Sequence, residues 1–310
     1  MRLVVAIGGN ALLRRGEPLD AATQRRNVVT ACRAIAALSP PHELIITHGN
    51  GPQVGLLALQ AAALAAVAPY PLDVLDAQSE GMIGYLLEQE LMNALPGREI
   101  VTLLTQVVVD ADDPAFRHPT KPIGPVYPAA EGERLAAARG WPLAADGAGW
   151  RRVVASPAPR RIVELAAIRR LVNAGVIVIC VGGGGVPVTL DANGRLRGAE
   201  AVIDKDAASA LLAKGLAADG LLLLTDVPAL LLGWGTPTPR AILRATPEGL
   251  GAQVFDPQSM GPKVRAGIGF VAAGGRFAAI GRLEDTALVA MGAAGTRISR
   301  EPPDLVLVGD

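Results

Sequence analysis

The sequence is poor in the residue types that build metal sites, disulfide frameworks and nucleic-acid interfaces. Its 310 residues include three histidines and two cysteines, Cys32 and Cys180, which lie far apart. No C-x-x-C pair occurs, so the residues predict no Cys/His zinc site and two buried, reduced thiols. The ten aromatic residues are too few to favour a platform that stacks nucleic-acid bases.

An excess of charge of one sign and a long apolar run are also absent. The 29 basic residues balance 29 acidic ones, which disfavours a disordered chain, an acidic tail or a nucleic-acid binder. The longest apolar helical stretch, residues 56–68, is shorter than the about 20 residues that cross a membrane. The run LVVAI near the N-terminus ends in glycines and is typical of a first strand rather than a signal peptide. We therefore expect a soluble cytoplasmic protein with no membrane and no nucleic-acid partner.

Lysine is scarce beside arginine. Arginine supplies 25 of the 29 basic residues, and the lysines are Lys121, Lys205, Lys214 and Lys263. A coding bias toward arginine would produce the same ratio. However, an ammonium is a compact point charge and a guanidinium a broad planar fork, so a lysine can mark a place where arginine would not serve. Lys214 falls late in a helical pattern and is expected at the surface.

Apolar β-rich runs alternate with helical patterns along the chain. Strands are expected at residues 3–7, 43–47, 99–110 (one strand or a pair), 176–181, 221–225 and 276–281, with a hairpin over 186–198. Helices are expected at residues 21–38, 53–67, 73–95, 161–174, 206–216 and 261–273. This alternation predicts an α/β fold with a mostly parallel sheet that helices cover on both faces. Ligands of such sheets bind at the carboxyl ends of the strands.

Residues 111–160 interrupt this rhythm. They hold eight prolines and little periodicity, and the segment is too long for a plain connection in a compact domain. We interpret it as an inserted lid or small subdomain.

Three glycine-rich turns follow predicted strands: AIGGNAL (6–12), THGNGPQVG (47–55) and VGGGGVPV (181–188). Bare N–H groups followed by a helix can hold an anion, although each turn alone is equally typical of tight chain reversal. Neither a Walker loop nor G-x-G-x-x-G is present. His48 beside the second turn is interpreted as a structural hydrogen-bonding residue.

Two further segments place charges at predicted helix starts. In AVIDKDAASALLA (201–213), Asp204, Lys205 and Asp206 follow an apolar run, and in SMGPKV (259–264) Lys263 opens a helix. A surface charge cluster is the plain interpretation. Lysines held by carboxylates beside glycine turns would also suit a transferring phosphoryl group, so the set indicates phosphoryl transfer without a Walker loop.

Together these segments resemble the carbamate kinase family of the amino acid kinase superfamily. The resemblance covers essentially the whole chain and rests also on TQVVVDADDPAF (105–116), PTKPIGP (119–125), GWRRVVASP (149–157) and LLTDV (223–227). It implies one amino acid kinase domain over 1–310, a three-layer αβα sandwich with about eight mainly parallel strands. It also implies a lid at 111–160, a carbamate-side lobe at roughly 1–200 and a nucleotide-side lobe at 201–310.

The resemblance implies roles for residues that match the family's motifs. The carbamate and the transferred phosphoryl group would be lined by Gly8, Gly9, Asn10, Gly49, Asn50 and Gly51. Lys121 would reach from the lid onto this anion, Lys205 and Lys263 would bind nucleotide phosphate oxygens, and Asp204 would hold the lysines. Thr225 and Asp226 would lie near the nucleoside. Mg²⁺ would come with ATP or ADP and take no ligand from the protein.

The implied reaction is reversible transfer between ATP and carbamate, giving ADP and carbamoyl phosphate, in a homodimer that makes ATP in arginine or purine degradation. Alternatives are a kinase of another small carboxylic acid and a non-catalytic anion-binding protein on the same fold. Two departures from the family fall on the nucleotide side: PALLLGWGTPTP after LLTDV, where a tyrosine-containing segment is common, and Gln258, where glycine is usual.

Overall fold

Strands with two buried faces organise the fold. The computed structural model describes residues 1–13, 16–18, 20–63, 66–257 and 259–309. In β1 (Arg2–Ile7), Leu3, Val5 and Ile7 enter one hydrophobic cluster, whereas Val4 and Ala6 enter another on the opposite face. Side chains of a strand alternate between faces, so this continuous apolar run serves two helical layers, as the sequence predicts.

The largest sheet places β1 near its centre. Its order is β13-β14-β16-β15-β12-β1-β2-β9-β3, with β17 also paired to β14. The bounds are β2 (Glu43–His48), β3 (Ile100–Thr102), β9 (Ile177–Ile179), β12 (Gly220–Thr225), β13 (Leu231–Leu232), β14 (Arg240–Ala245), β15 (Phe277–Arg282), β16 (Thr296–Ile298) and β17 (Leu305–Leu307). From β3 to β15 all neighbours are parallel, and antiparallel pairs occur toward the β13 edge.

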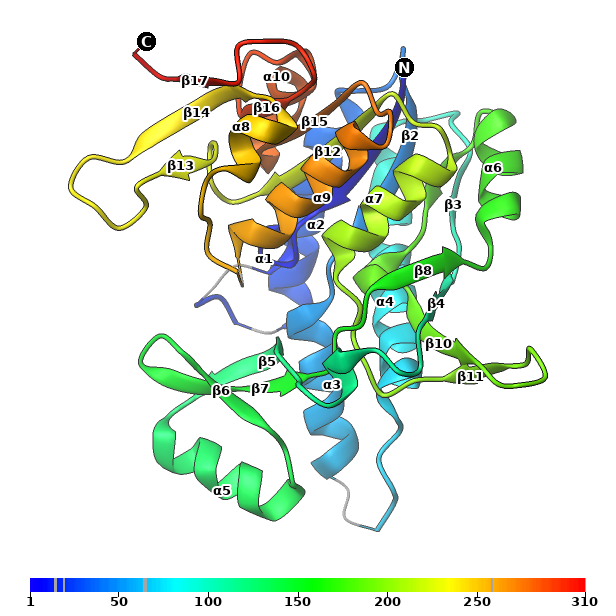
Figure 1. Cartoon of the computed structure of the whole chain (residues 1–310). Coiled ribbons are helices and arrows are strands. Elements are labelled where there is room, and N and C mark those ends of the chain that lie inside the picture. The colour runs from blue at the N-terminus through cyan, green and yellow to red at the C-terminus, as the bar shows by residue number, and fades with distance from the viewer. Residues whose placement is uncertain (14–15, 19, 64–65, 258, 310) are drawn as a thin grey trace.

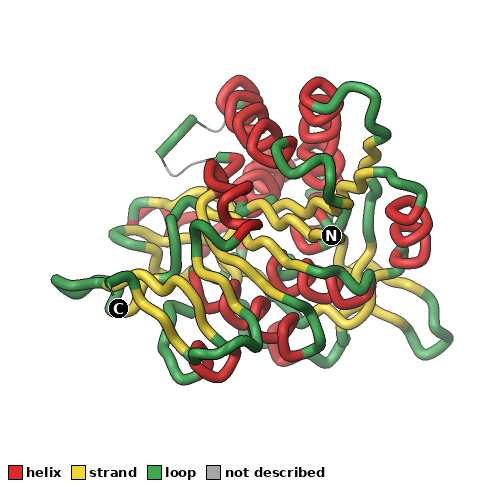
Figure 2. The backbone as a smooth tube through the Cα atoms, turned by 90° about the horizontal axis from the view of Figure 1, so that it is seen from above, coloured by secondary structure: helices red, strands yellow, loops and turns green. Residues whose placement is uncertain are grey.

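Helices cover both faces of this sheet, which gives the three layers of an α/β sandwich (Figure 1; Figure 2). One layer holds α2 (Ala21–Ala36), α4 (Leu72–Ala94) and α10 (Thr286–Met291). The other holds α6 (Leu165–Asn173), α7 (Lys205–Gly215), α8 (Pro247–Gly251) and α9 (Met260–Ala272). No helix within the described ranges is both long and apolar enough to cross a membrane.

A second sheet joins segments on either side of the proline-rich stretch. Its order is β11-β10-β4-β8, with β4 (Gln106–Val109), β8 (Pro159–Ile162), β10 (Val186–Leu190) and β11 (Leu196–Gly198). Residues 99–110 form two strands rather than one, and the two lie in different sheets, β3 in the largest and β4 in the second. β10 with β11 confirms the hairpin. The helix expected over 161–174 is wrong at its start, because residues up to Ile162 pair with β4 and the helix begins at Leu165.

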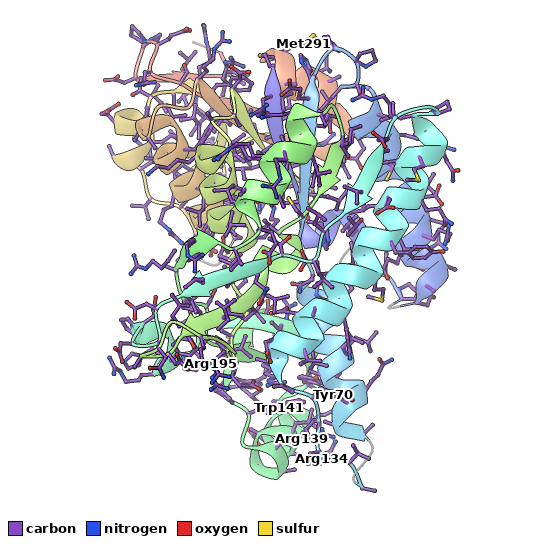
Figure 3. All side chains as sticks on the ribbon, turned by 90° about the vertical axis from the view of Figure 1, so that its right-hand side faces the viewer. Tyr70, Arg134, Arg139, Trp141, Arg195 and Met291 are labelled. Carbon is purple, nitrogen blue, oxygen red and sulfur yellow. The ribbon has the colours of Figure 1, made fainter. Side chains whose placement is uncertain are left out.

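Residues 121–154, which we call the small subdomain, form their own sheet below the main body (Figure 1). β5 (Lys121–Tyr127), β7 (Gly149–Val154) and β6 (Leu143–Asp146) pair in that order, and α5 (Ala129–Arg139) follows β5. Trp141 stacks with two guanidinium groups, Arg139 at 5.1 Å and Arg152 at 4.3 Å from the ring centre. Figure 3 shows Arg139 and Trp141 at this lower end of the molecule.

The small subdomain rests on α3 (Gly51–Ala63). Val54 and Ala58 of α3 pack with Ile123 and Val154 of the subdomain in a third apolar cluster. This contact fixes β5, which begins with Lys121, beside the helix that begins at Gly51.

Candidate active site

Two of the predicted glycine turns meet at the carboxyl ends of β1 and β2. Gly8 donates its N–H to the Leu224 carbonyl at 3.0 Å, and Gly49 donates to the Ile7 carbonyl at 3.0 Å. A Cβ on Gly49 would lie 2.8 Å from the backbone nitrogen of Gly9, so only glycine permits this approach. The N–H groups that begin α1 (Gly9–Leu12) and α3 therefore lie next to each other.

Asn10 is the second residue of α1. Its backbone belongs to the turn, while its side chain lies outside what the structure describes. Gln258, the departure noted before α9, is likewise outside the described residues.

The third glycine turn closes over Asn50. Val181, at φ +54°, leads into the short 3₁₀ turn η2 (Gly182–Gly184), where Gly183 has φ +68°. A Cβ on Gly183 would lie 2.2 Å from Asn50 Nδ2, so the turn needs glycine both for its φ and for this contact. A positive φ is costly for a β-branched residue such as Val181, and the N–H of Val181 is held by Thr105 Oγ1 at 3.0 Å.

Lys205 and Lys263 converge on one carboxylate, that of Asp206. Lys205 Nζ lies 2.6 Å from Asp206 Oδ1, and Lys263 Nζ donates to Asp206 Oδ2 at 2.9 Å. All three residues are buried: Lys205 is 7% exposed, Lys263 is 8% exposed and Asp206 is 4% exposed. The Lys205–Asp206 contact lacks hydrogen-bond geometry, so the Lys205 ammonium keeps donors for another acceptor.

Asp204 has a different partner from the one expected. It precedes α7, where its Oδ1 accepts the N–H groups of Asp206 and Ala207 at 3.0 Å each. Its Oδ2 accepts from Lys121 Nζ at 2.6 Å. The sequence predicts that Asp204 holds the lysines of the site. In the structure Asp204 contacts Lys121, whereas Asp206 contacts Lys205 and Lys263. We call these five residues the lysine–aspartate cluster.

Burial and mutual attraction set the protonation of this cluster. Burial lowers the pKa of Lys205 to about 8, although the Asp206 carboxylate opposes the shift. Burial would also lower the pKa of Lys263, but its contact with Asp206 outweighs this and raises it. Burial would raise the pKa of Asp206, yet the two ammonium groups bring it far below its usual range. Lys205 is thus the lysine of this pair that can lose its proton near neutral pH.

Thr225 and Asp226 lie at the end of β12, next to the first glycine turn. Thr225 Oγ1 donates to Asp226 Oδ1 at 3.1 Å, and a Cβ on Gly8 would lie 3.8 Å from Thr225 Cα. The carboxylate of Asp226 contributes to the raised pKa of Lys263. Asp226 is therefore close enough to Lys263 to influence its charge, and Thr225 lies beside the first glycine turn.

Sequence reasoning missed three buried polar residues of α4: Asp76, Ser79 and Glu80. Asp76 and Ser79 accept hydrogen bonds from Asn50 Nδ2 at 2.7 and 2.8 Å. Glu80 Oε1 accepts from the Gly182 N–H at 2.8 Å. Burial raises the pKa of Asp76 well above its usual value and that of Glu80 to about 8. Their spacing of i, i+3 and i+4 on one helical face was the available signal.

His48 is fully buried, and burial lowers its pKa to about 4. A neutral imidazole beside the Gly49 carbonyl, 3.3 Å from Nδ1, fits a structural residue. Among the described residues no group of three or more His, Cys, Asp or Glu is placed to hold a metal ion.

Comparison with known proteins places this arrangement in a family. The sequence profile of the amino acid kinase family matches residues 1–281. The chain belongs to this family. Within it, the chain is 54% identical over 302 residues to a carbamate kinase of Haemophilus influenzae, covering 97% of each, and 53% identical over 309 residues to one of Rhizobium meliloti, covering 98% of this chain and 95% of the relative. These identities place it among the carbamate kinases of the family.

Solved structures of carbamate kinases are similar to this chain as well. The carbamate kinase of Giardia lamblia bound to citric acid has a TM-score of 0.90 at 40% identity, covering 97% of this chain and 98% of that one. The same enzyme bound to AMP-PNP has a TM-score of 0.86, with the same identity and coverage. The amino acid kinase fold expected from the sequence is confirmed, and a homologue of this chain binds an ATP analogue.

Proposed function

We propose that this protein transfers a phosphoryl group reversibly between ATP and carbamate, giving ADP and carbamoyl phosphate. The observation that carries the proposal is the lysine–aspartate cluster beside three glycine turns. Three ammonium groups and two carboxylates leave one net positive charge in a largely buried site. Such a site attracts an anion and stabilises the charge that spreads over a transferring phosphoryl group.

The reaction needs positioning more than proton transfer. A carboxylate oxygen of carbamate attacks the γ-phosphorus, the bond from that phosphorus to the β-phosphate oxygen breaks, and its electron pair leaves with ADP. Carbamate is already an anion, so no general base is required, which is consistent with a neutral, buried His48. The work of the protein is to align the reactants and neutralise their charge.

The residues divide between the two substrates. Carbamate and the transferred group would lie against the glycine turns, lined by Gly8, Gly9, Asn10, Gly49, Asn50 and Gly51, with Lys121 above them from the small subdomain. Lys205 and Lys263 would bind the nucleotide phosphates, and Thr225 and Asp226 would lie toward the nucleoside. On this proposal residues 111–160, which include the small subdomain, are the lid. Roughly residues 1–200 carry the carbamate, and residues 201–310 carry the nucleotide.

Magnesium would enter with the nucleotide. Asp204 and Asp206, the carboxylates of the cluster, are each occupied by lysine ammonium groups. This donor set fits a metal held by phosphate oxygens rather than by the chain. When bound there, Mg²⁺ would neutralise phosphate charge and help to orient the γ-phosphate. The resemblance also supports a cytoplasmic homodimer that makes ATP in arginine or purine degradation.

The test is ATP formation from ADP, carbamoyl phosphate and Mg²⁺. We expect Lys205→Ala to lower kcat/KM by about a hundredfold or more, because a charge aimed at the transition state is lost. Lys214→Ala is the matched control, since Lys214 lies exposed at the other end of α7 and should leave the rate unchanged. Folded wild type without activity would shift the substrate to another small acid or the role to anion binding. Full activity in Lys205→Ala would remove the role of Lys205.

A further inference from the structure

Two hydrogen bonds to α4 hold the side-chain amide of Asn50 in one orientation. The residue is 2% exposed, and its Nδ2 donates to Asp76 Oδ1 at 2.7 Å and to Ser79 Oγ at 2.8 Å. Both acceptors come from α4, one turn apart. The two hydrogens of the amide nitrogen are therefore both engaged by this helix.

Ser79 decides which end of the amide faces α4. A hydroxyl has a single hydrogen to donate, and Ser79 Oγ donates it to the Asp76 carbonyl at 2.9 Å. Toward Asn50, Ser79 can then only accept, so the atom facing it must be the amide nitrogen.

The consequence is a fixed place for the amide oxygen. Within the described residues no group donates to Asn50 Oδ1, and this oxygen is not among the sealed side-chain atoms that lack a partner. It therefore keeps a small accessible surface in a residue that is otherwise buried, and Gly183 packs against the same amide. A buried carbonyl oxygen in this position favours a ligand that brings an N–H or O–H donor.

We propose that Asp76 and Ser79 are positioning residues that aim Asn50 Oδ1 at the amino group of carbamate. This rests on the proposed function and adds to it the feature by which the site distinguishes its substrate. Acetate has the same carboxylate but carries a methyl group where carbamate carries NH₂. With acetate the aimed oxygen would remain unpaired, which is how a site built for a donor rejects an analogue that lacks it.

The experiment compares carbamoyl phosphate with acetyl phosphate as phosphoryl donors to ADP. The quantity measured is the ratio of the two kcat/KM values on one preparation, because a ratio does not depend on the fraction of folded enzyme. Wild type should favour carbamoyl phosphate by at least about tenfold. In Ser79→Ala the ratio should fall by about tenfold, through loss of rate with carbamoyl phosphate and little change with acetyl phosphate.

Two sets of variants separate this role from simple support of the fold. Ser209→Ala removes another fully buried helical hydroxyl, one that donates to the Lys205 carbonyl at 2.6 Å, and should leave the ratio unchanged. Asp76→Asn keeps an oxygen that can accept from Asn50 and should stay within about threefold of wild type, whereas Asp76→Ala should behave like Ser79→Ala.

Each outcome bears on one proposal. Equal use of both donors by wild type, or an unchanged ratio in Ser79→Ala and Asp76→Ala, would overturn the role of Asp76 and Ser79 while leaving carbamate kinase activity intact. A wild type that forms no ATP from carbamoyl phosphate would instead overturn the proposed function on which this inference rests.

Discussion

Two aspartates separated by one residue do different work in this protein. Asp204 stands before α7 and turns back to cap it, which leaves its second oxygen for Lys121. Asp206 lies inside the first turn and points between Lys205 and Lys263. The motif IDKD predicts charges at a helix start, but it does not tell which carboxylate is the cap. That choice depends on where α9 and the small subdomain pack against α7.

The pKa of Lys205 predicts a fall in activity at alkaline pH. The ammonium is protonated below its pKa of about 8 and is lost as the pH rises through that value. Since the neutral amine cannot attract phosphate oxygens, kcat/KM for ATP formation should decrease above about pH 8. Lys263 has a raised pKa and should stay charged over the same range.

Asp206→Asn tests the cause of that pH dependence. The Asp206 carboxylate raises the pKa of Lys205 against the effect of burial. Removing its charge should move the alkaline fall to lower pH, as well as lower the maximal rate. A profile that stays flat to high pH in wild type, or that moves upward in the variant, would contradict the role given to the Lys205 ammonium.

At the scale of elements, local sequence patterns predicted most of the helices and strands. Several strands that the sequence did not predict form only through long-range pairing. Continuous apolar runs predicted β1, β2 and β12, and the glycine turns expected after β1 and β2 lie at the carboxyl ends of those strands. The helix expected from residue 161 overlaps the last two residues of β8, because these residues form a strand only through pairing with β4, some 50 residues earlier. The sheet of the small subdomain was missed for the same reason. The sequence predicts α4 as a helix. It does not predict that Asp76, Ser79 and Glu80 contact Asn50 and Gly182, because these contacts depend on how β2 and η2 pack against α4.

The contact between α3 and β5 predicts that Gly55 cannot carry a side chain. A Cβ on Gly55 would lie 2.0 Å from both Cα and N of Gly124, which are backbone atoms that cannot rotate away. Gly55→Ala should therefore push the small subdomain off α3. We expect a loss of about 1–3 kcal/mol of unfolding free energy, typical of overpacking, and a lower kcat/KM because Lys121 moves with β5.

Gly81→Ala is the matched control for this substitution. Gly81 is also inside a helix, α4, but a Cβ there would meet nothing within 4 Å. Alanine should stabilise the helix by about 0.5–1 kcal/mol. Urea unfolding and the ATP assay check both variants. Wild-type stability and rate in Gly55→Ala would show that the subdomain does not depend on this contact.

At the scale of the whole molecule, the site exists only where separate parts meet. β1, β2 and η2 supply the glycine turns, α7 and α9 supply Lys205 and Lys263, and the small subdomain supplies Lys121. The sequence predicted these parts one by one, and the family resemblance supplied their common role. Their mutual contacts come from the tertiary structure, and the one between Lys121 and Asp204 joins the subdomain to the start of α7.

Asp204→Asn isolates that link. Asparagine is also a good N-cap, so α7 should keep its start while the ion pair to Lys121 is lost. The pair is partly exposed, with 29% and 23% of the two side chains accessible, so its contribution should be about 1 kcal/mol. Amide hydrogen exchange in residues 121–154 should then become about fivefold faster, with little change elsewhere.

The matched control is Asp191. It likewise accepts from backbone N–H groups and pairs with an arginine, but it lies in the β10–β11 turn. Asp191→Asn should leave exchange in 121–154 unchanged. Equal exchange in Asp204→Asn and wild type would mean that the ion pair to Lys121 does not hold the small subdomain in place.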